Sequence, residues 1–163
     1  MEQLEKIKAK ILPRDQIRNL RNVWTFKERK VIFTNGCFDI LHLGHIEYLS
    51  KAADLGHVLV IGLNSDSSVR RLKGPGRPVT NEDARAMILA SLSFVTAIVI
   101  FDEETPHRLI EQLQPDVLVK GADYTTEEIA GHDIVLERGG EVVTIPLTEG
   151  YSTTDIIKKI GAV

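Results

Sequence analysis

Hydrophobic and polar positions follow two rhythms along the chain, and the rhythms predict strands separated by helices. Short runs of β-branched and aromatic residues are typical of buried strands, whereas apolar residues spaced three or four apart are typical of helices. Strands are expected at 31–34, 57–63, 96–100, 117–120 and 141–145, and helices at 44–55, 65–72, 81–92, 106–113, 126–138 and 152–160. Such an alternation favours right-handed crossovers and a parallel sheet. We therefore expect an α/β fold, a Rossmann-like parallel sheet of about five strands with helices on both faces.

The first 29 residues precede this alternation and have a helical pattern of their own. Apolar residues are spaced for one helix face before Pro13 and again between 17 and 24. No internal repeat or low-complexity tract interrupts the rest of the chain. We expect an N-terminal helical extension over 1–29, followed by a single domain over 30–163.

Length and composition limit the class of protein. The chain has 163 residues, 43% of them hydrophobic, which suits one domain with a buried core and excludes a disordered chain. Twenty Lys and Arg stand against 23 Asp and Glu, a net charge of -3, so we expect no nucleic-acid partner. The longest apolar run, 94–101, is far shorter than the roughly 20 residues of a membrane helix. With one cysteine, Cys37, and no signal-peptide pattern, a cytoplasmic protein without membrane contact is expected.

Polar residues gather after the predicted strands. Ligands of open parallel sheets bind outside the carboxyl ends of the strands, so these groups are expected to share one edge. The groups are Asn35–Asp39 with His42–His45, Asn64–Asp66, Asp102–Thr105, Lys120–Tyr124 and Thr148–Thr154. The opposite ends of the strands carry ordinary turn residues. This distribution indicates a binding site at the carboxyl edge.

The group after the first strand has the residue types of an anion site. Gly36 lets a phosphate approach the backbone, and His42 and His45 lie three apart around Gly44 at a predicted helix start. Both imidazoles can then reach the same anion. The alternatives are histidines that only cap or pack, and a metal site, which needs a third or fourth ligand. The first strand is not followed by G-x-G-x-x-G, so a dinucleotide-binding dehydrogenase is disfavoured.

Long stretches of the chain resemble a known enzyme family. GCFDILHLGHIEYL, residues 36–49, resembles the G-x-F-D-x-x-H-x-G-H signature of the HxGH nucleotidyltransferase superfamily, which includes cytidylyltransferases. Four further segments resemble the adenylyltransferase domain of bacterial ADP-heptose synthases. They are NSDSSVRRLKGPGRPV, EDARAMIL, VLVKGADY and EGYSTTDII. The likeness runs from about Lys30 to the C-terminus.

The resemblance implies the HxGH nucleotidyltransferase fold and a specific reaction. ATP and D-glycero-β-D-manno-heptose 1-phosphate would give ADP-heptose and pyrophosphate, in lipopolysaccharide core precursor biosynthesis. The sugar phosphate would attack the α-phosphorus in line, so the protein has to position two anions and neutralise developing charge. Mg²⁺ is expected with ATP, without a metal site on the protein. A homodimer is a further expectation. ADP-heptose synthases are commonly fused to a sugar kinase, and this sequence shows no kinase pattern, so a separate upstream kinase is expected.

The resemblance also implies roles for individual residues. The expected catalytic residues are His42, His45 and Lys73, with Lys73 closing over the phosphates from a Gly- and Pro-rich loop. The expected nucleotide-binding residues are Gly36, Cys37, Phe38, Gly44, Arg85, Lys120, Gly121, Asp123, Ser152 and Thr153. The expected acceptor-substrate residues are Asp39, Asn64 and Asp66. Three of these residues have structural alternatives: Lys73 as a solvated loop residue, Asp39 as a loop anchor and Asp66 as part of a helix cap.

The helix predicted at 81–92 carries a charged residue, Arg85, beside its expected buried face. That face comprises Ala84, Ile88 and Leu92, with Thr80 as a plausible N-cap. Arg85 is expected to reach inward to a phosphate. An ion pair with Glu82 is the alternative.

Other functions remain open at this point. Leu147 precedes T-E-G where cytidylyltransferases carry an arginine, which favours the heptose branch over a cytidylyltransferase of another sugar, polyol or amino-alcohol phosphate. A nucleotide-sensing module that lost its activity is the alternative from a different class. The intact histidine, lysine and serine positions argue against it.

Overall fold

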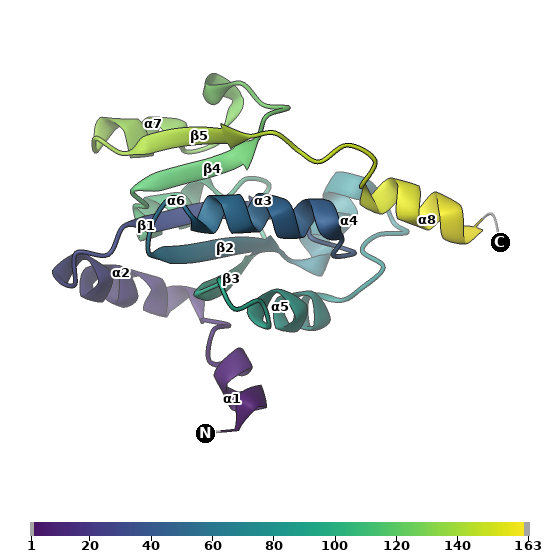
Figure 1. Cartoon of the computed structure of the whole chain (residues 1–163), viewed down its shortest axis with the longest axis horizontal. Coiled ribbons are helices and arrows are strands. Elements are labelled where there is room, and N and C mark those ends of the chain that lie inside the picture. The colour runs from purple at the N-terminus through teal and green to yellow at the C-terminus, as the bar shows by residue number, and fades with distance from the viewer. Residues whose placement is uncertain (1, 162–163) are drawn as a thin grey trace.

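The computed structural model describes residues 2–161 and confirms a parallel α/β sheet (Figure 1). Five strands pair in the order β3-β2-β1-β4-β5, and every pair is parallel. They are β1 (Val31–Gly36), β2 (Val58–Asn64), β3 (Ala97–Phe101), β4 (Val117–Gly121) and β5 (Glu141–Ile145). The strand order reverses direction at β1, which makes the carboxyl end of β1 the switch point where open α/β sheets bind ligands.

Helices cover both faces of the sheet. They are α1 (Gln3–Lys8), α2 (Ile17–Phe26), α3 (Leu43–Ala53), α4 (Asp66–Lys73), α5 (Glu82–Ala90), α6 (His107–Leu113), α7 (His132–Glu137) and α8 (Thr153–Gly161), with short 3-10 turns η1 (Arg14–Gln16) and η2 (Thr126–Glu128). One core cluster joins α3 and α5 to the sheet, and a second joins α2, α6 and α7 to the other face. All seven residues of β2 are buried, as expected for a central strand covered on both sides. Within residues 2–161, no helix is both long and apolar enough to cross a membrane.

The helix predicted at 126–138 is divided in the structure. The chain forms η2, then α7, with Gly131 between them at φ 83°. A Cβ at Gly131 would lie 2.7 Å from Ile110 Cδ1, so the chain passes α6 too closely for a side chain. The left-handed backbone at this glycine prevents one continuous helix.

The buried face of α5 differs from the predicted one. Asn81, rather than Thr80, caps the helix by accepting a hydrogen bond from the Ala84 N–H at 2.9 Å. The buried residues are Arg85, Ala86, Leu89 and Ala90. Ile88 is 45% exposed, so the prediction that it faces the core is wrong.

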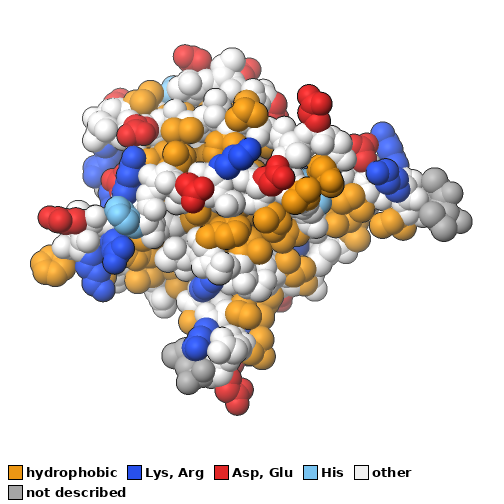
Figure 2. All heavy atoms as spheres, viewed as in Figure 1, with side chains coloured by type: hydrophobic (Ala, Val, Ile, Leu, Met, Phe, Trp, Pro, Cys, Tyr) orange, Lys and Arg blue, Asp and Glu red, His pale blue; other side chains and the backbone are white. Residues whose placement is uncertain are grey.

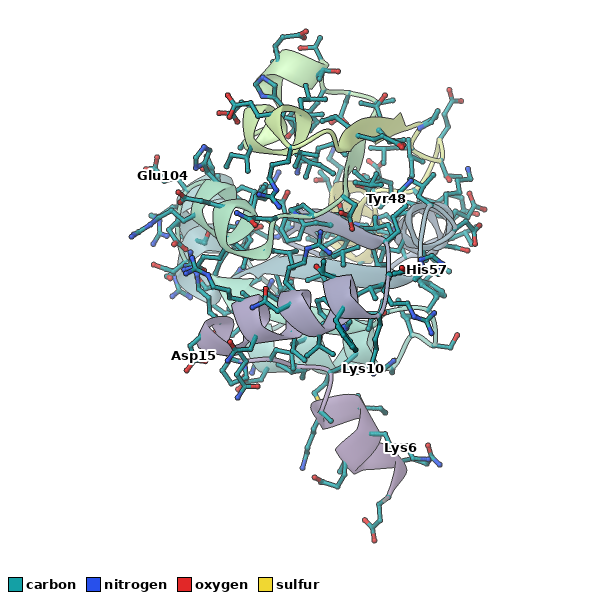
Figure 3. All side chains as sticks on the ribbon, turned by 90° about the vertical axis from the view of Figure 1, so that its left-hand side faces the viewer. Lys6, Lys10, Asp15, Tyr48, His57 and Glu104 are labelled. Carbon is teal, nitrogen blue, oxygen red and sulfur yellow. The ribbon has the colours of Figure 1, made fainter. Side chains whose placement is uncertain are left out.

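The N-terminal segment extends the sheet at its β3 edge. Ile98 in β3 donates to the Lys10 carbonyl, and the Leu12 N–H donates to the Ile98 carbonyl, both at 2.8 Å. This pairing covers part of an edge strand that would otherwise present open hydrogen-bonding groups. Beyond it, α1 buries no residue and projects below the sheet in Figure 1; Figure 3 shows Lys6 on this projecting helix.

Candidate active site

Unpaired polar atoms are concentrated at the carboxyl end of β1. Among residues 2–161, three buried side-chain atoms have no hydrogen-bond partner: Asn35 Oδ1, His42 Nδ1 and His45 Nδ1. An unsatisfied buried polar group costs about 1–3 kcal/mol, so native proteins keep few of them. All three atoms come from the end of β1 and the start of α3. Their concentration at one strand end indicates a site that polar ligands complete.

The two histidines lie against each other at the start of α3. Their ring centroids are 3.7 Å apart with an interplanar angle of 20°, and Phe38 meets the His45 ring edge-on at 5.1 Å. His42 is the extended N-cap residue of α3, and His45 lies in its first turn. A Cβ at Gly44 would lie 3.2 Å from His42 Nδ1, so glycine leaves the His42 ring its place. The sequence prediction that both rings reach one point is consistent with this stacking.

Both imidazoles favour the neutral form. Burial and, to a smaller extent, the neighbouring His42 together lower the pKa of His45 to about 4. Burial also lowers the pKa of His42. A neutral imidazole carries one N–H donor and one acceptor nitrogen. The pair can therefore donate to phosphate oxygens at the N-terminus of an 11-residue helix, where backbone N–H groups add to the positive potential.

Asp39 anchors the loop between α4 and α5. Its side chain is buried, and it accepts hydrogen bonds from Arg77 Nε at 2.5 Å, the Val79 N–H at 2.7 Å and the Thr80 N–H at 3.2 Å. These bonds tie the Gly- and Pro-rich loop to the segment after β1. Asp39 thus has the loop-anchoring contacts considered as its alternative, while its predicted contact with the acceptor stays untested.

Arg85 is the largest fully buried side chain of the described core. Its guanidinium donates to Thr80 O at 2.9 Å, Cys37 O at 2.6 Å, Asn64 O at 2.8 Å and Asp66 Oδ1 at 2.7 Å. All of these oxygens belong to the protein, so the guanidinium joins the ends of β1 and β2 to the start of α5. Its predicted contact with a phosphate stays untested, while these bonds show that it positions the ends of β1 and β2.

Asp66 has the partners of a helix-start residue. Its carboxylate pairs with Arg85, and its N–H donates to Glu82 Oε2 at 2.6 Å. The ion pair considered between Arg85 and Glu82 is replaced by this arrangement. Ser65, one residue earlier, is the N-cap of α4 and accepts from the Ser68 N–H at 3.0 Å. Asp66 therefore lies in the first turn of α4 at the end of β2.

Two lysines approach the Cys37 thiol from different elements. Burial raises the pKa of Cys37, and the positive charges of Lys73, Arg85 and Lys120 oppose that rise. Lys73 is the exposed last residue of α4, and Lys120 is a half-buried residue of β4. The fold thus brings cations from both sides of β1 to the loop that carries the histidines.

The end of β4 supplies an ammonium group from the half-buried Lys120. Lys120 Nζ lies 3.4 Å from the Asn35 carbonyl oxygen and 5.3 Å from the centroid of the Tyr124 ring. Burial lowers the pKa of Lys120, while the nearby Asp123 carboxylate acts in the opposite direction. Gly121 is buried at the end of the strand, and Asp123 is exposed beside it. These residues lie next to the end of β1, as predicted.

The start of α8 lies against the loop after β1. Ser152 caps the helix: its Oγ accepts from the Asp155 N–H at 3.0 Å and donates to Asp155 Oδ2 at 2.8 Å. Thr153 Oγ1 donates to the Ile40 carbonyl at 3.5 Å. None of the residues of α8 is fully buried, and Figure 1 shows the helix projecting past the strand ends. In Figure 2, hydrophobic side chains lie between and below the charged groups in the region of α3, and they continue toward α8.

The structure adds residues to which the sequence assigned no role. Thr148 donates to the Glu47 carboxylate on α3, which links the segment before α8 to the histidine helix. Tyr151 packs at Gly44, where an added Cβ would lie 3.3 Å from Tyr151 Cβ. Asn35 and Tyr124 also belong to the site, because the carbonyl oxygen of Asn35 and the ring of Tyr124 both contact Lys120 Nζ. Their place in the polar groups after the strands was the only sequence signal for them.

No metal cage is evident in the part of the chain that the structure describes, because no three His, Cys, Asp or Glu side chains are grouped there as ligands. Asp39, the buried carboxylate of the histidine loop, is held by Arg77 and two backbone N–H groups.

Comparison with known proteins identifies relatives over most of the chain. Residues 33–159 match the family described as cytidylyltransferase-like. The bifunctional protein HldE of Syntrophotalea carbinolica is 53% identical over 152 residues, which are 93% of this chain and 31% of that protein. The protein of the same name from Wolinella succinogenes is 51% identical over 151 residues, with the same coverage. The chain thus spans about a third of the length of these relatives.

Solved structures share the fold. The lipopolysaccharide core biosynthesis protein from Thermoplasma volcanium is 27% identical with a TM-score of 0.61, over 76% of this chain and 99% of that one. A pantoate-β-alanine ligase from Francisella tularensis is 16% identical with a TM-score of 0.57, over 94% of this chain and 78% of that one. The second likeness concerns the fold alone.

Proposed function

Because the chain belongs to the cytidylyltransferase-like family, we propose that it joins ATP to D-glycero-β-D-manno-heptose 1-phosphate and releases pyrophosphate. The product is ADP-heptose, a precursor of the lipopolysaccharide core. Identity near 50% to the HldE proteins supports this choice, as does the likeness to a lipopolysaccharide core biosynthesis protein. The observation that carries the proposal is the stacked histidine pair, whose unpaired nitrogens lie at the start of α3.

The histidines stabilise the transition state in this proposal. A phosphate oxygen of the sugar attacks the α-phosphorus of ATP, and the bond to the β-phosphate breaks on the opposite side. Negative charge develops on the oxygens around phosphorus and on the departing pyrophosphate. His42 and His45 each donate an N–H to these oxygens from fixed positions. Loss of one such donor typically reduces turnover about 10²–10³-fold.

Other groups hold the nucleotide. Lys73 and Lys120 supply positive charge from opposite sides of the histidine loop, and the N-terminus of α8 faces that loop. The residues that we place at the nucleotide are Gly36, Cys37, Phe38, Gly44, Lys120, Gly121, Asp123, Ser152 and Thr153. Arg85 acts through the carbonyl groups of Cys37 and Asn64, which it holds in place. We place the acceptor next to Asn64 and Asp66 at the end of β2, with Asp39 fixing the loop that covers it.

Mg²⁺ enters this scheme with ATP. Its ligands are phosphate oxygens and water, which suits an ion that keeps most of its hydration shell. The other substrate is a sugar 1-phosphate, so a kinase reaction must precede this one. We place the reaction in the cytoplasm, where ATP is made. We propose a homodimer as the active assembly.

Pyrophosphate release over a matrix of four nucleoside triphosphates and several sugar or alcohol phosphates tests the proposal. We expect the highest kcat/KM for ATP with the heptose 1-phosphate. A preference for CTP would replace the proposal with a cytidylyltransferase. Absence of turnover with every pair, in protein that still binds ATP, would favour a nucleotide-sensing module.

A further inference from the structure

Asn35 occupies a distinctive place at the end of β1. It pairs in register with Gly62 of β2, and a Cβ at Gly62 would lie 3.3 Å from Asn35 Cβ and 2.7 Å from Phe33 Cζ. The side chains of Phe33 and Asn35 therefore share one face of the sheet, the face covered by α2 and α6. Thr34 points to the other face, where its hydroxyl lies 2.7 Å from Tyr48 Oη of α3. Glycine at position 62 gives the Asn35 side chain its space.

The side-chain amide of Asn35 is not satisfied by the protein. Its Oδ1 is buried and has no partner within residues 2–161. The residue as a whole is half-buried. A buried amide oxygen without a donor is costly, and a ligand hydroxyl that donates to it removes that cost.

A cation lies beside this amide. Lys120 follows Leu118 by two residues on β4, so its side chain lies on the same face of the sheet as those of Leu118 and Phe33. Lys120 Nζ lies 3.4 Å from the Asn35 carbonyl oxygen. No carboxylate lies within 4.0 Å of Nζ among the described residues. Asn64 follows Gly62 by two residues on β2 and so faces the same side. The end of the sheet thus has the Asn35 amide and the Lys120 ammonium group on the face opposite to α3, while the buried Asn64 amide donates to Ser68 Oγ at 3.0 Å.

We propose that Asn35 is a specificity-determining residue of the acceptor subsite, where its side-chain amide binds a hydroxyl group of the sugar phosphate beside the Lys120 ammonium. This inference rests on the proposed function. The histidines come from α3 on one face of β1, and the amide lies on the other, so two substrates can approach the end of β1 from opposite sides. Lys120 then lies where the phosphate of the acceptor meets the triphosphate.

The chemistry of the subsite favours a phosphorylated sugar over the nucleotide base. The Lys120 ammonium lies over one face of the neighbouring Tyr124 ring, 5.3 Å from the ring centroid, where it competes with a base for that face. An ammonium group beside an amide, with no carboxylate within 4.0 Å among the described residues, suits an anionic, hydroxylated ligand. An amide can accept from one hydroxyl and donate to its neighbour, which distinguishes sugars by the position of their hydroxyl groups.

Steady-state kinetics of the full chain test this assignment. For Asn35→Ala we expect KM for the sugar 1-phosphate to rise about tenfold, or about 1.4 kcal/mol, while KM for ATP stays within about twofold. Calorimetric ATP binding without acceptor should match that of the wild type. Asn35→Asp keeps the shape but places a negative charge near the phosphate, so its KM for the acceptor should rise further. Asn22→Ala, at an exposed position of α2, is the matched control and should change neither constant.

Mono-deoxy sugar 1-phosphates identify the bound hydroxyl. With the wild type, kcat/KM for the analogue that lacks the bound hydroxyl should be about tenfold lower than for the complete sugar phosphate. With Asn35→Ala, the analogue and the complete sugar phosphate should have equal kcat/KM. A rise in KM for ATP with Asn35→Ala, or unchanged constants for both substrates, would overturn the assignment while leaving the proposed reaction intact. If the wild type instead uses another phosphorylated alcohol, the proposed heptose reaction is wrong. The KM of Asn35→Ala for that other acceptor then tests the role of Asn35. Absence of all turnover overturns both.

Discussion

His42 and His45 stack with ring centroids 3.7 Å apart, and the Nδ1 atom of neither ring has a hydrogen-bond partner within residues 2–161. Two imidazoles this close repel each other when both are protonated. Burial lowers the pKa of both rings, which favours the neutral form and leaves the two Nδ1 atoms without a protein partner among the described residues. The two unsatisfied nitrogens cost stability in the free protein, and such a cost is typical of residues kept for binding a ligand.

His45→Ala should reduce kcat about 10²–10³-fold, because it removes a donor to the reacting phosphate oxygens. Circular dichroism and the urea midpoint should stay close to those of the wild type, since the variant also removes an unsatisfied buried nitrogen. His107→Ala, at an exposed position of α6, is the matched control and should retain full turnover. Turnover of His45→Ala within a few-fold of the wild type would remove the histidine from the mechanism.

Stability should fall as the pH falls from about 6.5 to about 4. The pKa of His45 is lowered from 6.5 to about 4 in the folded protein, chiefly by burial. In this window the unfolded chain binds the proton and the folded protein does not, so acid favours unfolding by up to about 3 kcal/mol. Urea unfolding at several pH values measures the slope. His45→Gln should show a shallower slope than the wild type, and equal slopes would contradict the assignment.

Arg85→Ala should destabilise the fold by about 3–5 kcal/mol. The change leaves the carbonyl groups of Cys37, Asn64 and Thr80 and the Asp66 carboxylate without their donor. Arg85→Lys should recover only part of the loss, because an ammonium group cannot reproduce the planar fork. Chemical denaturation measures both variants, with the exposed Arg18→Ala on α2 as the control. If Arg85→Ala unfolds like the wild type, the four bonds do not hold the site together.

Gly44→Ala should separate turnover from stability. Its new Cβ would lie 3.2 Å from His42 Nδ1, so the ring must shift by a few tenths of an ångström. We expect kcat to fall about tenfold, since small displacements of catalytic groups have large effects. The free energy of unfolding should not fall, because alanine favours a helix. Gly76→Ala adds a Cβ with no neighbour within 4 Å and should leave kcat unchanged.

Local pattern predicted the layers of this protein and the edge at which its site lies. Residue type and periodicity are set by neighbours in the chain, so the alternation of strands and helices was evident without tertiary information. The same holds for the histidine loop, because its glycines and histidines lie within ten residues of one another. The helix predicted at 126–138 was an exception, since the break at Gly131 depends on how closely the chain passes Ile110.

The partners of individual polar groups depended on contacts between distant segments. Arg85 was expected to reach a phosphate, which stays untested. The structure shows that its guanidinium donates to the Cys37 and Asn64 carbonyl oxygens at the ends of β1 and β2, 48 and 21 positions away along the chain. Its burial also sets the inner face of α5 and leaves Ile88 exposed. Asn35 appeared in the sequence as one member of the polar group after the first strand, and only the packing around it shows an amide oxygen without a partner among residues 2–161. Which polar groups the protein satisfies, and which it leaves for a ligand, is decided when separate strands and helices come together, because a hydrogen bond requires two groups in place at once.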